Sequence, residues 1–337
     1  MTTRKWFFSF LKKYKWRLTV AFIFSGITSL LALVRPYVSG KLVDDVIKGN
    51  KRELLVPLIA IFISVTVVRS IFRYVYLYLF ETSSQGILYS MRDHVYHRFL
   101  EQDFDFYNTH RTGDLMSRQT GDLDAVRHFI AYTCHCVFEN LILFILAVVM
   151  IFKVNVILAL SMIAVIPLGA LTVYKQLTKV APKFHAIRQR FSSLNTFVQE
   201  NISGNRVVKA FAKEDFEIKK FNIENDGYRD AELDCTKVWQ KYVPIFEFLS
   251  NLITIIMYLV GGILVIKEKI TIGDLFVIGN LQWMLVAPLR QAGWLANDYQ
   301  RFVTSIQKIY STINVEPSIK QPEDPVVIQR LSGAISF

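Results

Sequence analysis

The chain has 337 residues, with 52% apolar and 14% aromatic side chains, a formal net charge of +11 and a mean hydropathy of +0.32. These values argue against a water-soluble domain and favour a protein that crosses a membrane several times. The basic residues gather beside apolar runs instead of forming an aromatic-interleaved patch. This pattern disfavours a nucleic-acid partner and favours a lipid bilayer with anionic headgroups.

Residues 1–17 predict an amphipathic elbow helix that lies on the inner leaflet before the first span. Trp6, Phe7, Phe10 and Tyr14 recur at helical spacing among lysines and arginines. A cleaved signal peptide is the alternative interpretation, but no small-residue cleavage site follows the apolar run.

Six apolar runs are long enough to cross a membrane, since about 20 helical residues span a hydrocarbon core of ~30 Å. They begin near Leu18, Leu54, Ile130, Val154, Val243 and Ile270. The fold class is therefore an all-α polytopic membrane protein, with six transmembrane helices in residues 18–313. Basic residues are more abundant before the first run than after it, which predicts a cytoplasmic amino terminus in a multi-pass protein of the cell membrane.

Two connections are much longer than the others, at about residues 81–129 and 175–241. Residues 54–101 are expected to form one helix that continues far beyond the membrane. Residues 183–201 and 228–242 each carry an apolar stripe spaced three and four residues apart, so each is expected to be a helix that needs a partner.

The sequence changes character where each pair of long helices reverses. "DFDFYNTHRTGD" (103–114, the first tip) and "AKEDFEIKKF" (212–221, the second tip) mix aromatic with charged residues. We expect each to be a short knob far from the bilayer, with Phe104, Phe106, Tyr107 or Phe216 exposed. Such a knob is typical of a surface that docks into a groove of another protein.

Charged residues inside spans are costly and are candidate substrate-binding groups. Arg69 and Arg73 share one face of the second span, and Glu139 is at a depth where a salt bridge to them could form. This arrangement suggests a charged belt around an inward-open cavity, and the alternative is that the arginines extend to lipid headgroups without binding substrate. The complete set of candidate cavity residues is Arg69, Arg73, Glu139, Glu247, Gln282, Trp283 and Arg290.

A "CHC" motif at Cys134–Cys136 has metal-binding residue types. Residues two apart on a helix point to nearly opposite sides, so these cysteines cannot readily share one ion. No metal site is predicted.

Three motifs follow one another along the chain: "FYNTHRTGDLMSRQTGDLDAVR", "ENISGNRVVKAFAKEDFEIKKF" and "ITIGDLFVIGNLQWMLVAPLRQ". With these motifs in this order, the chain resembles the transmembrane domain of an ATP-binding cassette (ABC) exporter, of the six-span half-transporter type found in bacterial multidrug and lipid flippases. The first motif is similar to the first intracellular loop of that family, the second to the second loop and the third to the sixth span. The resemblance implies that residues 103–113 and 212–220 contain two coupling helices that contact nucleotide-binding domains. The implied coupling residues are Phe104, Phe106, Tyr107, Thr112, Gly113, Asp114, Glu214, Asp215 and Phe216.

The resemblance further implies a homo- or heterodimer of half-transporters that moves an amphipathic drug, lipid or peptide outward by alternating access. ATP and Mg²⁺ would be bound by the nucleotide-binding domain. Residues 314–330 are similar to the linker to that domain, and residues 331–337 to its first strand.

The 337 residues contain no G-x-x-x-x-G-K-[ST] phosphate loop, so we expect no cofactor in this chain and no ATPase activity from it alone. We expect it to be part of a longer half-transporter; a separate ATPase subunit is the alternative. A six-span channel or receptor without a motor is the alternative function, but no Gly-rich pore loop separates the spans.

Overall fold

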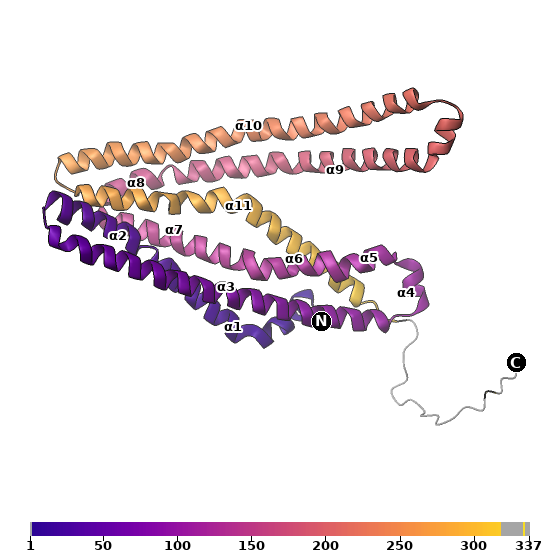
Figure 1. Cartoon of the computed structure of the whole chain (residues 1–337), viewed down its shortest axis with the longest axis horizontal. Coiled ribbons are helices and arrows are strands. Elements are labelled where there is room, and N and C mark those ends of the chain that lie inside the picture. Colours follow the sequence, from indigo (N-terminus) through magenta and orange to yellow (C-terminus); the bar gives the residue numbers. More distant parts are fainter. Residues whose placement is uncertain (1, 318–332, 334–337) are drawn as a thin grey trace. The chain divides into compact units, whose positions relative to one another are not determined.

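The computed structural model describes residues 2–317 and residue 333, and these residues form helices without a β-strand (Figure 1). The elements are α1 (Thr3–Leu31), α2 (Val34–Lys41), η1 (Leu42–Lys48), η2 (Arg52–Leu54), α3 (Leu55–Leu100), α4 (Phe104–Thr109), α5 (Thr112–Ser117), η3 (Arg118–Asp122), α6 (Leu123–His128), η4 (Phe129–Thr133), α7 (Cys134–Val154), α8 (Val156–Ile163), α9 (Ile166–Ala210), α10 (Glu214–Ile266) and α11 (Ile272–Ile313). The predicted all-α fold class is confirmed.

Six helical segments of the described chain are long and apolar enough to cross a membrane, which confirms the six predicted spans. They are Thr3–Lys48, Arg52–Leu100, Thr112–Val154, Val156–Ala210, Glu214–Ile266 and Ile272–Ile313. The chain is therefore a multi-pass membrane protein. Helix α3 has 46 residues and α10 has 53, whereas about 20 residues cross a bilayer. The predicted single helix over residues 54–101 is thus observed.

The chain divides into two compact units. The first unit is Met1–Ile23, Val75–His135 and Asn297–Phe337, and the second is Phe24–Tyr74 and Cys136–Ala296. Helices α1, α3, α7 and α11 contribute residues to both units.

The core of the second unit is formed by side chains of α7, α8, α10 and α11. Its largest fully buried side chains are those of Ile151, Leu158, Met162, Met257, Ile278, Leu281 and Leu285. Helix α8 begins directly after Asn155 because the side-chain oxygen of Asn155 accepts hydrogen bonds from the backbone N–H groups of Ile157 (2.9 Å) and Leu158 (3.2 Å).

The start of α11 is fixed by three side chains. Thr271 and Asp274 each accept a hydrogen bond from the other's backbone N–H, both at 2.9 Å, which is a reciprocal cap. Asp44 of η1 accepts a further hydrogen bond from the N–H of Gly273 at 2.8 Å.

Helices α2 and α11 approach each other closely at two glycines. Gly40 of α2 lies so near Gly273 that a Cβ atom at either glycine would collide with the carbonyl oxygen of the other. Glycine therefore permits the close approach.

Helices α9 and α10 lie side by side and pack through the two predicted apolar stripes (Figure 1). Val180 and Ile187 of α9 are buried against Cys235 of α10, and the rings of Phe191 and Tyr228 are 5.6 Å apart. The predicted pairing of residues 183–201 and 228–242 with partner helices is confirmed, and each is the partner of the other.

The turn between α9 and α10 contains a residue in the left-handed backbone region. Ala212 has a φ angle of 47°. Its N–H donates to the carbonyl oxygen of Lys209 at 3.3 Å, and the N–H of Lys213 donates to the carbonyl oxygen of Val208 at 3.1 Å. These two bonds define a Schellman helix end, in which glycine is the usual residue at the Ala212 position.

The core of the first unit combines α1, α3, α4, α5, α6, η4 and the last turns of α11. Its buried members include Met91, Val95, Leu123 and Ile309. Asp122 joins α11 to η3, because its carboxylate accepts hydrogen bonds from Ser305 (2.7 Å) and Arg118 (2.8 Å).

The amino-terminal segment differs from the predicted elbow. Helix α1 runs without a break from Thr3 to Leu31, so no boundary separates residues 1–17 from the first span. Trp6 and Phe7 are buried in the core of the first unit, and Phe10 and Tyr14 pack against it. These aromatic residues hold the helix on the protein, whereas the sequence pattern predicted contact with lipid.

The predicted first strand of a nucleotide-binding domain and most of the predicted linker lie outside the described residues.

Candidate functional site

The first tip is built around a short helix, α4, that carries one buried and one displayed aromatic ring. Asp103 caps the helix by accepting a hydrogen bond from the N–H of Phe106 at 3.0 Å. Phe104 is 86% exposed, whereas Phe106 is 4% exposed and packs on Phe99. The ring of His110 stacks on the Phe106 ring, with centroids 4.2 Å apart.

The prediction that Phe106 is an exposed docking residue is therefore wrong. Its ring anchors α4 in the core of the first unit, because burial of an aromatic ring removes a large apolar area from water. Tyr107 is partly exposed, and its hydroxyl donates to the carbonyl of Phe99 at 2.7 Å. Phe104 is the ring that remains free to meet another molecule.

Helix α5 follows at once and places Thr112, Gly113 and Asp114 on the surface. Leu115 is buried and fixes this helix to the core of the first unit. The first tip thus presents a surface of mixed aromatic, hydroxyl and carboxylate groups, held from beneath by Phe106 and Leu115.

The second tip exposes Asp215 and the ring of Phe216, while Glu214 is half-buried. The ammonium group of Lys220 lies 4.5 Å from the centre of the Phe216 ring. Lys209 donates a hydrogen bond to the carboxylate of Glu214 at 2.8 Å. This hydrogen bond lowers the pKa of Glu214, a residue outside the membrane-spanning stretch that begins near Val243.

Apolar residues surround the second tip and have no partner in the core of the second unit. Val207, Phe211, Ile218 and Ile223 are all exposed. A groove beside them, with a volume of about 610 Å³, is lined by Phe197, Glu200, Asn201, Gly204, Val207, Val208, Glu217, Lys220, Ile223 and Glu224. An apolar surface with charged edges is suited to receive side chains of another protein.

The charged candidates of the spans differ in how far they are exposed. Arg69 and Glu139 are half-buried and Arg73 is exposed, and Glu247 and Arg290 are also exposed.

Of the two uncharged candidates, Gln282 contributes to packing between helices. Its amide donates to the hydroxyl of Thr254 and to the carbonyl of Ser250 (3.3 Å), which joins α11 to α10. Trp283, the next residue, is exposed. A second polar contact, Asn140 to Gln291 at 2.7 Å, joins α7 to α11 and was not identified from the sequence.

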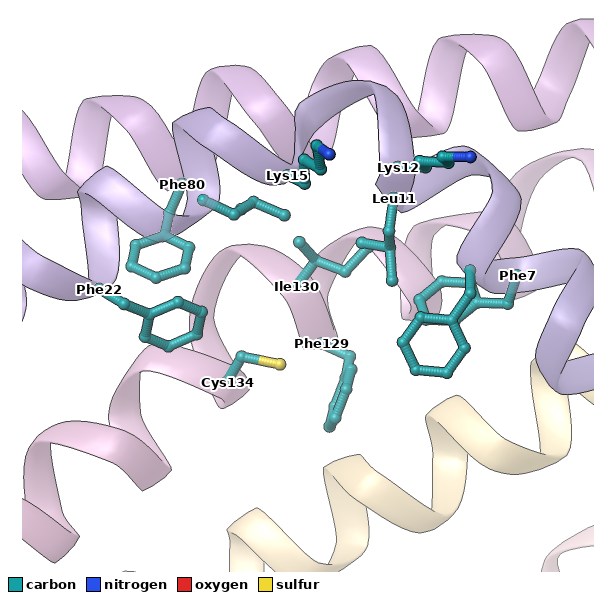
Figure 2. A pocket seen from close by; sticks show the side chains of 11 residues that line it. Phe7, Leu11, Lys12, Lys15, Phe22, Phe80, Phe129, Ile130 and Cys134 are labelled. Atoms are coloured by element: carbon teal, nitrogen blue, oxygen red, sulfur yellow. The ribbon is translucent and has the colours of Figure 1, made fainter.

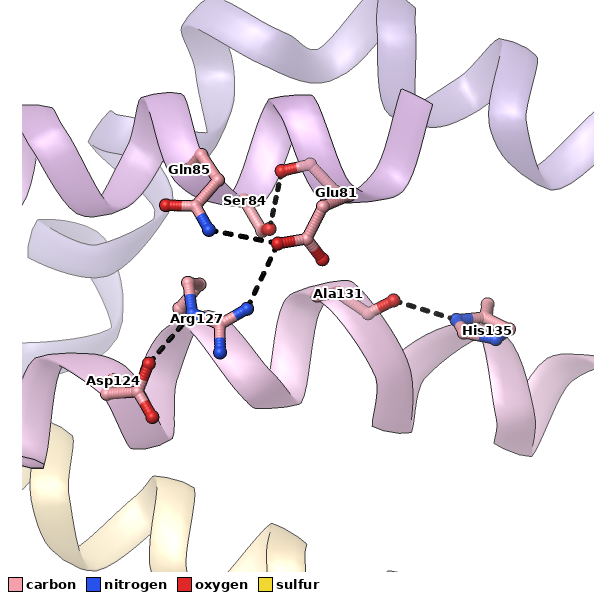
Figure 3. A network of polar contacts seen from close by, with 7 residues as sticks. All are labelled: Glu81, Ser84, Gln85, Asp124, Arg127, Ala131 and His135. Carbon is pink, nitrogen blue, oxygen red and sulfur yellow. Dashed lines mark hydrogen bonds and ion pairs between the residues drawn. The ribbon is translucent and has the colours of Figure 1, made fainter. Parts of the chain in front are cut away.

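A polar network in the first unit was also missed (Figure 3). Glu81 of α3 accepts hydrogen bonds from Arg127 of α6 (3.1 Å) and Gln85 (2.9 Å), and Arg127 also binds Asp124 at 2.8 Å. No sequence signal could identify the contact between Glu81 and Arg127, because they are 46 residues apart on separate helices.

Comparison with known proteins defines the family. The sequence model of the family described as the ABC transporter transmembrane region matches residues 18–289, and the chain belongs to this family. It is 30% identical over 334 residues to the ABC transporter ATP-binding protein YknU of Bacillus subtilis. The aligned residues cover 98% of this chain and 57% of YknU. It is 28% identical over 320 residues to an ATP-dependent lipid A-core flippase of Syntrophus aciditrophicus, covering 94% of this chain and 52% of the flippase.

A third relative is the multidrug resistance-like ATP-binding protein MdlA of Buchnera aphidicola subsp. Baizongia pistaciae, at 27% identity over 312 residues, with 92% of this chain and 53% of MdlA covered. The chain thus spans about half the length of the curated relatives it matches.

The sequence has no G-x-x-x-x-G-K-[ST] phosphate loop. The part of the chain that the structure describes has no cluster of three His, Cys, Asp or Glu side chains that could hold a metal ion.

Proposed function

We propose that this chain is the transmembrane part of an ATP-driven exporter that moves an amphipathic drug, lipid or peptide from the cytoplasm or inner leaflet outward. The observation that carries the proposal is the first tip, where Phe104 is displayed on a helix that Phe106 anchors. A ring held rigidly in this way can transmit displacement, because the helix beneath it moves with the core.

In the proposed mechanism, nucleotide-binding domains contact the first tip through Phe104, Tyr107, Thr112, Gly113 and Asp114. They contact the second tip through Glu214, Asp215 and Phe216. These domains bind ATP and Mg²⁺, and their closure moves the long helices so that a cavity alternates between inward-open and outward-open states. The names of the flippase and multidrug relatives support this assignment.

The membrane arrangement follows from the same proposal. Two half-transporters, identical or different, form the pore in the cell membrane, with both tips and the amino terminus in the cytoplasm. The excess of Lys and Arg in residues 1–17 supports this orientation. The cavity residues proposed for substrate contact are Arg69, Arg73, Glu139, Glu247, Gln282, Trp283 and Arg290.

The test is photo-cross-linking in membranes that contain the whole transporter with its ATPase domain. A photoreactive phenylalanine at position 104 or 216 is expected to form an adduct with a nucleotide-binding domain. Tyr89 of α3 is 75% exposed and lies outside both tips, so the same substitution there is the matched control. Equal yields from positions 89, 104 and 216, or none from 104 and 216, would overturn the proposal.

A further inference from the structure

A groove in the first unit lies along one face of α1 and has no assigned role (Figure 2). Its volume is about 570 Å³, within the range of roughly 300–1,000 Å³ that is usual for sites of small ligands. The lining residues come from α1, α3, η4 and the start of α7, and they include Lys12, Lys15, Phe22, Phe80, Ile130 and Cys134.

The groove has an apolar wall and a cationic edge. The lining side chains are aromatic or aliphatic, and the exceptions are the thiol of Cys134 and the ammonium groups of Lys12 and Lys15. The wall is built from rings that pack on one another, such as Phe22 and Phe80, whose centroids are 4.9 Å apart. An occupant with a long hydrocarbon segment would cover this wall.

The two lysines at the edge are not neutralised by the protein. Lys12 and Lys15 are three residues apart and thus lie on one face of α1. Both are exposed, and neither forms an ion pair with another described residue. Helix α1 itself contains no Asp or Glu. The charge of the edge therefore favours an anion and disfavours a cationic amphiphile.

We propose that this groove binds an anionic glycerophospholipid of the bilayer. One acyl chain lies against Phe22, Phe80 and Ile130, and the phosphodiester pairs with Lys12 and Lys15. A soluble phosphate would satisfy the lysines but leave the aromatic wall in contact with water. A membrane lipid satisfies both.

The bound lipid is a resident component and differs from the exported cargo. All candidate cavity residues, from Arg69 to Arg290, belong to the second unit, whereas every residue that lines this groove belongs to the first. The lipid fills space between α1 and the helices on which it packs, so it stabilises the attachment of α1 within the first unit.

The experiment uses the whole protein in vesicles that carry a phosphatidylglycerol with a diazirine on one acyl chain. After illumination, adducts are expected on peptides that contain residues 7–22 and 129–134. The double substitution Lys12→Gln and Lys15→Gln is expected to raise the phosphatidylglycerol concentration for half-maximal labelling about tenfold to thirtyfold, because each lysine contributes attraction to an anionic lipid.

The matched control is Lys13→Gln with Arg17→Gln, which removes the same charge from exposed positions outside the groove. This variant is expected to label as the unchanged protein does. Three results would overturn the proposal: equal labelling by a diazirine phosphatidylcholine, equal loss in both double variants, or competition by glycerol phosphate without acyl chains. The readout needs neither ATP nor transport, so it is independent of the proposed exporter function.

Discussion

Asp44 accepts a hydrogen bond from the backbone N–H of Gly273 at 2.8 Å, although 229 residues separate them in the sequence. The N–H groups in the first turn of a helix have no partner within the helix, so a carboxylate supplied from η1 completes the cap that Thr271 and Asp274 begin. The last span is thereby tied to the end of the first at its opening turn.

Substitution Asp44→Ala is expected to lower the free energy of unfolding by about 1–2 kcal/mol, as loss of a helix cap usually does. The measurement is the midpoint of thermal unfolding in detergent. Asp45, whose carboxylate lies 3.5 Å from Lys51 at the surface, provides the control. Asp45→Ala is expected to change stability by less than about 1 kcal/mol. Equal shifts in both variants would contradict a capping role for Asp44.

Substitution Gly40→Ala is expected to destabilise the second unit by about 1–3 kcal/mol, because the new methyl group would collide with the carbonyl oxygen of Gly273. Gly262, inside α10, has no atom within 4 Å of the corresponding position. Gly262→Ala should therefore stabilise the protein by about 0.5–1 kcal/mol. Chemical denaturation of both variants checks the opposite signs, and a neutral Gly40→Ala would show that the helices can separate at low cost.

Substitution Ala212→Gly is expected to stabilise the turn between α9 and α10. A residue with a Cβ atom at φ 47° is strained by roughly 1–2 kcal/mol, and glycine removes most of that strain. Hydrogen exchange of residues 207–214 should slow accordingly. Ala210→Gly, at the last residue of α9, is expected to have the opposite effect, and faster exchange in Ala212→Gly would refute the strain argument.

Substitutions of the two phenylalanines of the first tip are expected to affect different properties, one the stability of the protein and the other the proposed coupling to ATP hydrolysis. Phe106→Ala should cost about 3–5 kcal/mol, the usual penalty for removing a buried ring. Phe104→Ala should change stability by no more than about 0.5 kcal/mol. In the whole transporter, Phe104→Ala should nevertheless reduce substrate-stimulated ATP hydrolysis. Unfolding curves and ATPase assays measure the two effects, and normal stimulation in Phe104→Ala would weaken the proposed docking role.

The helices could be predicted from the sequence because their signals are local. Length and hydropathy were sufficient to predict six spans, and the spacing of Phe191 and Tyr228 with their neighbours was sufficient to predict two packed faces. The break expected after residue 17 is not observed, since a change from basic to apolar residues does not by itself interrupt helical hydrogen bonds.

The site could be predicted only in part, because which side of a short helix is buried depends on distant residues. Phe104 and Phe106 are equally aromatic in the sequence, and the cap at Asp103 and the position of Phe99 decide which one faces the core. The relation between Arg73 and Glu139 is limited in the same way. Depth along two helices does not determine how the helices are rotated.

The anchoring of Phe106 also determines which molecules could compete with this protein for the proposed nucleotide-binding domain. The ring lies in one cluster with Trp6 and Ile309, so the conformation of the first tip is maintained by residues from both ends of the chain. A synthetic peptide of residues 103–114 would lack that support, and six helical residues are well below the roughly 12–15 that an isolated helix needs in water. An effective decoy would have to be covalently stapled into a helix.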